Sequence, residues 1–190
     1  MKRFLVLAGL LVSLTSGAEV PTVDHLSGLS GYAGQEARDI KAMPPEDVQS
    51  YLLGKGMGLA KAAELNGYPG PSHVLSLASQ LHLTPQQKKL TEALFVSMEE
   101  KAVGFGLPLV EEERNLDRSF ADKVITPAAL ASSMARIGEL QAKVREVHLE
   151  AHLAQVLILT KEQIVLYMQL RGYTPKGSQT DHGHHLHTGG

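Results

Sequence analysis

The chain has 190 residues, of which 18 are basic and 20 are acidic, and its formal net charge at pH 7 is −2. It contains no cysteine and no tryptophan, with only four phenylalanines and five tyrosines. Disulfides and a lipid-linked cysteine are therefore excluded, and the charge balance offers no basic surface for nucleic acid. So few aromatic side chains suit long helices packed along a seam, or a dimer, better than a deep globular core.

The first residues predict a secretory signal peptide. Lys2 and Arg3 precede an apolar stretch from Phe4 to Leu14, and small residues follow up to Ala18. This pattern predicts cleavage after residue 18 and export to the periplasm. An uncleaved anchor is the weaker alternative, because a helical span needs about 20 apolar residues.

Residues 19–43 mix glycine with polar residues and predict a flexible lead-in. Pro44 and Pro45 precede two acidic residues and predict the start of a helix, whose apolar spacing continues until the segment 66–71 ends it. A short helix is expected from about Ser72 to Leu81.

Two long helices and a short one follow. The first long helix carries an apolar stripe from Leu90 to Phe120, and Gly104, Gly106 and Pro108 within it predict a kink near Gly104, not an end. The second begins near Thr126–Pro127, and a last helix covers about Lys161 to Arg171. No stretch alternates with period two, so the prediction is an all-α domain over residues 44–173: a long kinked helical hairpin with short flanking helices. Residues 174–190 are expected to be a disordered, histidine-rich tail.

Two helix starts carry the same pattern, a capping box led by leucine. The threonine hydroxyl accepts a hydrogen bond from the third helical N–H, while the glutamine side chain accepts one from the threonine N–H. In the first copy a proline fills the first helical position, where its missing N–H costs nothing. The shared residues are Leu83, Thr84 and Gln87 in the first copy, and Leu159, Thr160 and Gln163 in the second.

Two LTxxQ motifs in a signal-bearing helical chain resemble the Spy/CpxP superfamily and its heavy-metal-resistance relatives. The resemblance covers roughly Pro45 to Tyr173, and the segment from Gly56 to Pro71 is similar to a subgroup of periplasmic metal sensors and refolding chaperones. It implies a hairpin that dimerises into an antiparallel, cradle-shaped homodimer. Members of the superfamily hold unfolded envelope proteins without ATP, restrain a sensor kinase, or bind transition metals.

The second long helix contains a candidate metal-binding pair, His148 and His152. Side chains four residues apart share one face of a helix, so both imidazoles can bind one Zn²⁺, Ni²⁺, Co²⁺ or Cu²⁺ ion. The pattern differs from that of HExxH metalloproteases, because Glu150 is about 200° around the helix from the first histidine and cannot act as the general base. A hydrolase is therefore not expected. The alternative is that His148 extends the apolar stripe and His152 lies at its rim.

Some metal-binding members of the superfamily carry ligands one turn apart on the helix before the second LTxxQ motif, where His148 and His152 lie. The resemblance implies further ligands from the first helix. There this chain offers only Met57 and Glu64 and no histidine.

The tail is a second candidate metal site. Four histidines in six residues bind transition metals promiscuously, although an unfolded segment must be ordered on binding. The alternative is a solvated tail with incidental affinity, and in either case binding there is expected to leave stability nearly unchanged. His73 and His82 are isolated and are expected to be structural or solvent-facing. The tail histidines are His182, His184, His185 and His187.

The sequence thus predicts a periplasmic binding protein, not an enzyme, of the envelope-stress or metal-response kind. It is expected to bind a transition metal, an unfolded client protein, or both. The alternative is an ATP-independent holdase without a metal role, which the amphipathic helices and the adaptable side chains of Met98 and Met134 favour.

Overall fold

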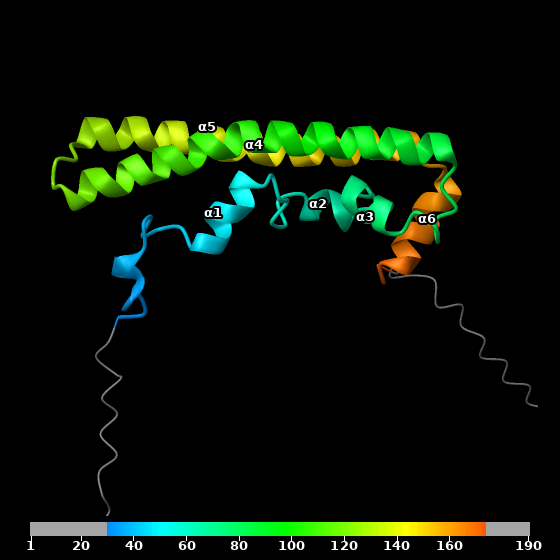
Figure 1. Cartoon of the computed structure of the whole chain (residues 1–190), viewed down its shortest axis with the longest axis horizontal. Helices are drawn as coiled ribbons and strands as arrows, with labels where there is room; N and C mark the ends of the chain where they lie inside the picture. Colours follow the sequence, from blue (N-terminus) through cyan, green and yellow to red (C-terminus); the bar gives the residue numbers. More distant parts are fainter. Residues whose placement is uncertain (1–29, 174–190) are drawn as a thin grey trace, which may run out of the picture. The chain divides into compact units, whose positions relative to one another are not determined.

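The computed structural model describes residues 30–173, so the predicted signal peptide and the histidine-rich tail lie outside the described residues. All helices belong to one compact unit that begins at Gln35. The described part is all-helical and contains no strand, as predicted (Figure 1). Its elements are η1 (Gln35–Ala37), α1 (Pro45–Leu52), α2 (Lys61–Glu64), α3 (Pro71–Ser76), α4 (Pro85–Ala121), α5 (Pro127–Ile158) and α6 (Lys161–Leu170).

Helices α4 and α5 pack against each other as the predicted antiparallel hairpin. Their central seam is a buried aliphatic cluster that runs along the facing sides of the two helices. The residues at the centre of the seam are Leu109, Ile137, Leu140 and Val144.

No helix between residues 30 and 173 is long and apolar enough to cross a membrane.

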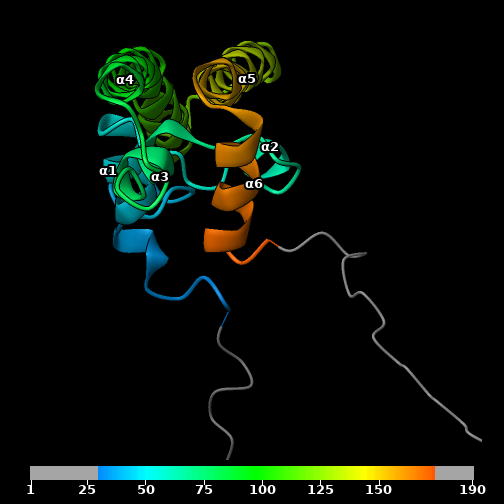
Figure 2. The same cartoon turned by 90° about the vertical axis from the view of Figure 1, so that its right-hand side faces the viewer.

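The short helices cover one side of this hairpin. Helices α1 and α3 pack against α4, and α2 packs against α5 (Figure 2). Beyond the end of α5, α6 folds back toward α3, and Tyr167 of α6 is fully buried with Val74 of α3. The hairpin therefore forms one wall of the molecule, and α1, α2, α3 and α6 form the other.

The sequence signals for helix starts are confirmed. Proline occupies the first position of α1, α3, α4 and α5, where its missing N–H and fixed φ are favourable. Both predicted capping boxes are present, at Thr84 with Gln87 and at Thr160 with Gln163.

The two capping boxes also contact each other. Gln87 Nε2 donates to Gln163 Oε1 over 2.8 Å, and Gln163 Nε2 donates to Gln87 Oε1 over 3.1 Å. Gln87 further donates to the carbonyl of Ile158, and Gln163 to that of Leu81. The motifs thus join the start of α4 to the junction between α5 and α6.

The prediction of a single helix from Pro45 to about residue 65 is wrong. The chain instead forms α1 and α2, separated by a loop at residues 53–60. Gly54 and Gly58 have φ values of 61° and 78°, which belong to the left-handed region and end a right-handed helix. The helical spacing of Leu52 and Leu59 was misleading, because the loop returns Leu59 to the hairpin core without a helix.

Two other expectations need correction. A flexible lead-in is expected over residues 19–43, of which the structure describes 30–43; in that part, Ile40 and Met43 are buried against Val110 of α4, and Lys41 forms an ion pair with Asp117. The helix expected from Ser72 to Leu81 ends at Ser76, and the chain continues in turns.

Helix α4 continues through Gly104, Gly106 and Pro108 without a break, as expected for a kink that is not an end. Its C-terminal part is inclined to the part before it in Figure 1. Proline removes one backbone hydrogen bond and crowds the preceding turn, which accounts for such a bend.

Candidate metal-binding cavity

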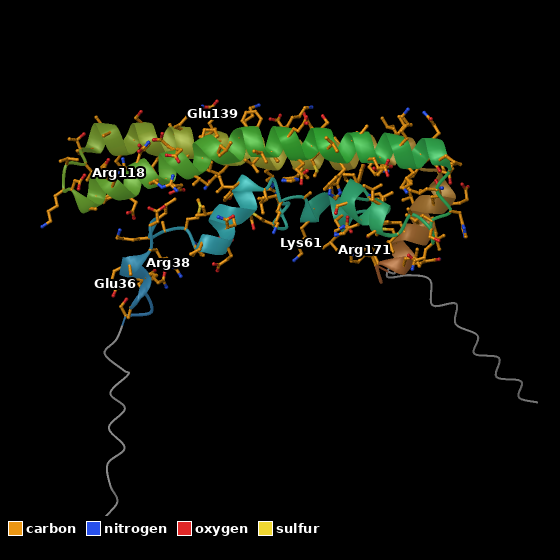
Figure 3. All side chains as sticks on the ribbon, in the orientation of Figure 1. Glu36, Arg38, Lys61, Arg118, Glu139 and Arg171 are labelled. Carbon is orange, nitrogen blue, oxygen red and sulfur yellow. The ribbon has the colours of Figure 1, made fainter. Side chains whose placement is uncertain are left out.

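A cavity of about 450 Å³ lies between the hairpin and the short helices. The loop at residues 53–60, α2, the start of α3 and the end of α6 supply one wall, and α4 and α5 supply the other. Lys61 of α2 and Arg171 at the end of α6, both labelled in Figure 3, lie at this cavity. The side chains with donor atoms for a metal are Met57, Glu64, His73, Met98, Glu99, His148 and His152.

His148 projects from α5 into this region and is only 3% exposed. Its Nε2 is fully buried and has no hydrogen-bond partner among the described residues. Burial, and then the nearby imidazole of His152, lower the pKa of His148 below its ordinary value of 6.5. The ring is therefore neutral at pH 7 and retains a lone pair, as a metal ligand requires.

His152 lies one helical turn later and is 8% exposed. Its Nδ1 is 2.7 Å from the carbonyl oxygen of Tyr68. A carbonyl can only accept, so Nδ1 carries a proton, and Nε2 is the ring nitrogen left to bind a metal. Gly70 faces the same ring, and a Cβ there would stand 2.8 Å from Nε2, so glycine leaves this edge of the imidazole clear of a side chain. In metal sites, the ring nitrogen that does not bind the metal commonly donates to a backbone carbonyl, which orients the histidine.

Glu64 of α2 is a buried carboxylate beside the histidine pair. Its Oε1 accepts hydrogen bonds from Tyr167 Oη at 2.6 Å and from Arg171 Nε at 3.2 Å. Its Oε2 is buried without a hydrogen-bond partner and lies 3.9 Å from Nδ1 of His152. Burial raises the pKa of Tyr167 and the neighbouring Glu64 raises it further, so this phenol stays protonated and donates to Glu64.

Two methionines line the same cavity, Met57 from the loop and Met98 from α4. Met57 has a φ of 47°, which is uncommon for a residue with a Cβ and marks a locally constrained backbone. A Cβ added to Gly56 beside it would stand 3.9 Å from the ring of His148. The loop thus brings a thioether-bearing residue to the cavity that His148 and His152 also line.

The described residues supply only part of a coordination sphere. Between residues 30 and 173, no three side chains of His, Cys, Asp or Glu are grouped closely enough to hold one ion. Two imidazoles with a neighbouring carboxylate and thioethers therefore form an incomplete donor set in this arrangement.

The other residues considered in the sequence analysis lie either at the cavity or away from it. His73 belongs to the cavity, with its Nδ1 3.5 Å from Oε1 of Glu64, whereas His82 is exposed elsewhere. Glu150 is exposed and lines a different groove, with Leu149 and Leu153, as its helical position predicted. The tail histidines lie outside the described residues. Sequence reasoning missed the carbonyl of Tyr68 and the side chains of Tyr167 and Arg171, for which no local pattern gave a signal.

No family model, curated protein or solved structure matches this chain.

Proposed function

We propose that this protein is a periplasmic, non-enzymatic protein of the metal-response or envelope-stress kind that binds a transition-metal ion through His148 and His152. The observation that carries the proposal is the state of the two imidazoles. Both are buried at one cavity; one is oriented by a backbone carbonyl and the other lacks a hydrogen-bond partner at its buried nitrogen. A buried polar atom without a partner costs free energy, and a bound ion would offset that cost.

The residues around the pair fit a borderline or soft metal. Neutral imidazoles suit Zn²⁺, Ni²⁺, Co²⁺ and Cu²⁺, and the thioethers of Met57 and Met98 add a preference for copper. Glu64 supplies a carboxylate oxygen that has no hydrogen-bond partner and compensates positive charge. Hard cations such as Mg²⁺, which prefer oxygen ligands, are a poor fit.

Location and assembly follow from the sequence and from the resemblance to the Spy/CpxP superfamily. The signal peptide supports export, and the paired LTxxQ motifs support an antiparallel homodimer of cradle shape. In this proposal the metal-bound dimer acts on a partner, either a sensor kinase or an unfolded envelope protein.

Calorimetric titration of the chain lacking residues 1–18 with Zn²⁺, Ni²⁺, Co²⁺ and Cu²⁺ tests the proposal. A metal that prefers the native state must also raise the melting temperature. The double variant His148→Ala, His152→Ala should lose that thermal shift, while His82→Asn, which changes an exposed histidine away from the cavity, should keep it. An unchanged shift in the double variant would show that the pair is structural.

A second candidate function is an ATP-independent, Spy-like holdase without a metal role. The observation that favours it is an apolar ridge along α5, in which Leu153 and Leu157 are 56% and 87% exposed and Leu149 is half-buried one turn before them. Met134 on the same helix is also exposed. Contiguous exposed apolar side chains mark surfaces that bind proteins.

A further inference from the structure

The cavity that His148 and His152 line has more room than a metal ion needs. Its volume is about 450 Å³, and sites for small organic ligands typically have about 300–1,000 Å³. Apolar side chains form part of its wall, namely Leu53, Met57, Phe95 and Met98. The cavity can therefore hold an organic molecule beside an ion bound to the two imidazoles.

The histidine pair also leaves part of the coordination sphere open. Within residues 30–173, no third side chain of His, Cys, Asp or Glu is grouped closely enough with the pair to hold one ion. Transition-metal ions bind four or more ligands. Positions that the protein does not fill are taken by molecules from solution, which are either water or a chelating ligand.

The charge of the cavity favours an anionic ligand over water. Three cationic side chains and two carboxylates line it: Lys55, Lys61, Arg171, Glu64 and Glu99. Imidazole and thioether ligands carry no charge, so a divalent ion would add its full charge to this positive excess. Uncompensated charge in a partly buried site is costly, and neutral water molecules would leave it uncompensated.

The cationic groups are available to such an anion. Lys55 and Lys61 are exposed, and their ammonium groups form no ion pair within the described part of the chain. Arg171 donates to Glu64 through Nε and to Tyr173 through Nη2, while its Nη1 donates to no group in residues 30–173. Carboxylates are common partners of guanidinium and ammonium groups that have free donors.

We propose that this cavity binds a transition-metal ion as its complex with a small carboxylate chelator. The metal binds His148 and His152. Carboxylate groups of the chelator bind Lys55, Lys61 and Arg171, so the chelator supplies both the missing donor atoms and the missing negative charge. This inference rests on the proposed function and specifies the form in which the metal is bound.

Equilibrium dialysis with Co²⁺ and radiolabelled citrate tests the inference. The protein is the chain lacking residues 1–18, with the four tail histidines changed to alanine so that they do not compete for Co²⁺. One citrate should be retained for each Co²⁺, and without Co²⁺ the retention of citrate should be at least tenfold weaker. Retention of Co²⁺ without citrate, or of citrate equally well in the absence of Co²⁺, would overturn the inference.

A pair of lysine substitutions separates the chelator from the metal. Lys55→Gln with Lys61→Gln should weaken the Co²⁺-dependent retention of citrate at least tenfold. The same variant should bind Co²⁺ alone as tightly as the parent or slightly more tightly, because it removes positive charge near the ion.

The matched control is Lys89→Gln with Lys101→Gln, which changes two exposed lysines of α4 that do not line the cavity. It should retain citrate as the parent does. Equal retention of citrate in the two lysine variants would contradict the assignment of the chelator to Lys55 and Lys61.

Failure of the proposed function gives a different result. His148→Leu with His152→Leu should lose both Co²⁺ and citrate, and circular dichroism checks that this variant folds. If it retains both ligands as the parent does, the metal is bound elsewhere and the proposed function fails. If the parent binds Co²⁺ without citrate and the variant loses that Co²⁺, the proposed function holds and only the chelator inference fails. Should the double variant not fold, His148→Leu alone gives the same comparison.

Discussion

Gln87 and Gln163 each stabilise two parts of the chain at once. Each side-chain oxygen accepts from the backbone N–H of its own threonine cap, and each side-chain nitrogen donates across the helix junction. The two amides also bond to each other, so the hydrogen-bonding capacity of both is largely used. Residues that look like two local caps therefore form one tertiary link.

We expect Gln87→Ala to cost more stability than Thr84→Ala. The threonine change removes one cap, worth about 0.5–2 kcal/mol. The glutamine change removes the cap partner and also the bonds to Ile158 and Gln163, each worth about 0.5–1.5 kcal/mol. Urea denaturation measures both losses, and Gln86→Ala, at an exposed neighbouring position, is the control. Equal values for Gln86→Ala and Gln87→Ala would contradict the link.

His148→Leu should leave the metal-free protein equally stable or more stable, because the imidazole has a buried nitrogen without a partner and leucine fills a similar volume. Since burial lowers the pKa of His148 in the folded state, protonation favours unfolding. The stability that depends on a neutral His148 is fully present above about pH 6.5, and the free energy of unfolding decreases as the pH falls toward the pKa of His148 in the folded state. Denaturation in chelator at pH 7.5 and pH 5 should show a smaller loss on acidification for the variant. A variant that is less stable at both pH values would indicate a structural imidazole.

At the scale of elements, α1 approaches α4 through a glycine. A Cβ on Gly106 would collide with the backbone carbonyl of Tyr51, and a backbone group cannot move aside as a flexible side chain can. Gly106 is buried in the same helix in which Gly104 is exposed with open space around its Cα. Alanine at Gly106 and at Gly104 therefore distinguishes the cost of crowding between α1 and α4 from the gain in helix propensity.

Gly106→Ala should destabilise the protein by about 1–3 kcal/mol, because the added methyl overpacks the contact between α1 and α4. Gly104→Ala should instead stabilise it by about 0.5–1 kcal/mol, since alanine is the better helix former and meets nothing. Thermal and urea unfolding of the two variants measure the difference. Similar effects of both substitutions would mean that α1 does not pack closely on α4.

At the scale of the whole molecule, the hairpin has one covered side and other faces that remain open. Glu139 on α5 points away from the short helices in Figure 3. A groove along α5 is lined by the small residues Gly138 and Ala142, by Leu149 and Leu153, and by charged side chains that include Glu139, Lys143, Arg145, Glu146 and Glu150. Small residues allow close approach of a second helix and leucines supply apolar area, so this face is the one on which we test the proposed dimer.

Leu153→Glu together with Leu157→Glu should shift a dimer to monomer in sedimentation velocity, because a charge in an apolar interface is costly. Val165→Glu, which changes an exposed apolar residue on α6, is the control and should leave the mass unchanged. If the parent chain is monomeric and the variant with both leucines changed loses the ability to suppress aggregation of a reduced, unfolded client protein, the holdase function is favoured over the dimer.

Local sequence patterns were enough to predict where the principal helices begin. Thr84, Thr126 and Thr160 each cap a helix, and a proline or a charged residue follows at the first position. Capping involves groups within three residues of each other, so it is visible in a linear pattern. The long apolar stripes likewise predicted the hairpin, because each extends over many helical turns.

The break in the first predicted helix and the surroundings of the histidine pair depend on long-range packing, which no local pattern predicts. Leu59 fits a helical spacing, but it reaches the core from a loop whose left-handed glycines outweigh that pattern. Similarly, the sequence offered Met57 and Glu64 as possible ligands, yet only the packing of the loop and α2 against α5 places them at the cavity of His148 and His152. These contacts join residues more than 80 positions apart, and no local pattern of side chains encodes such a distance.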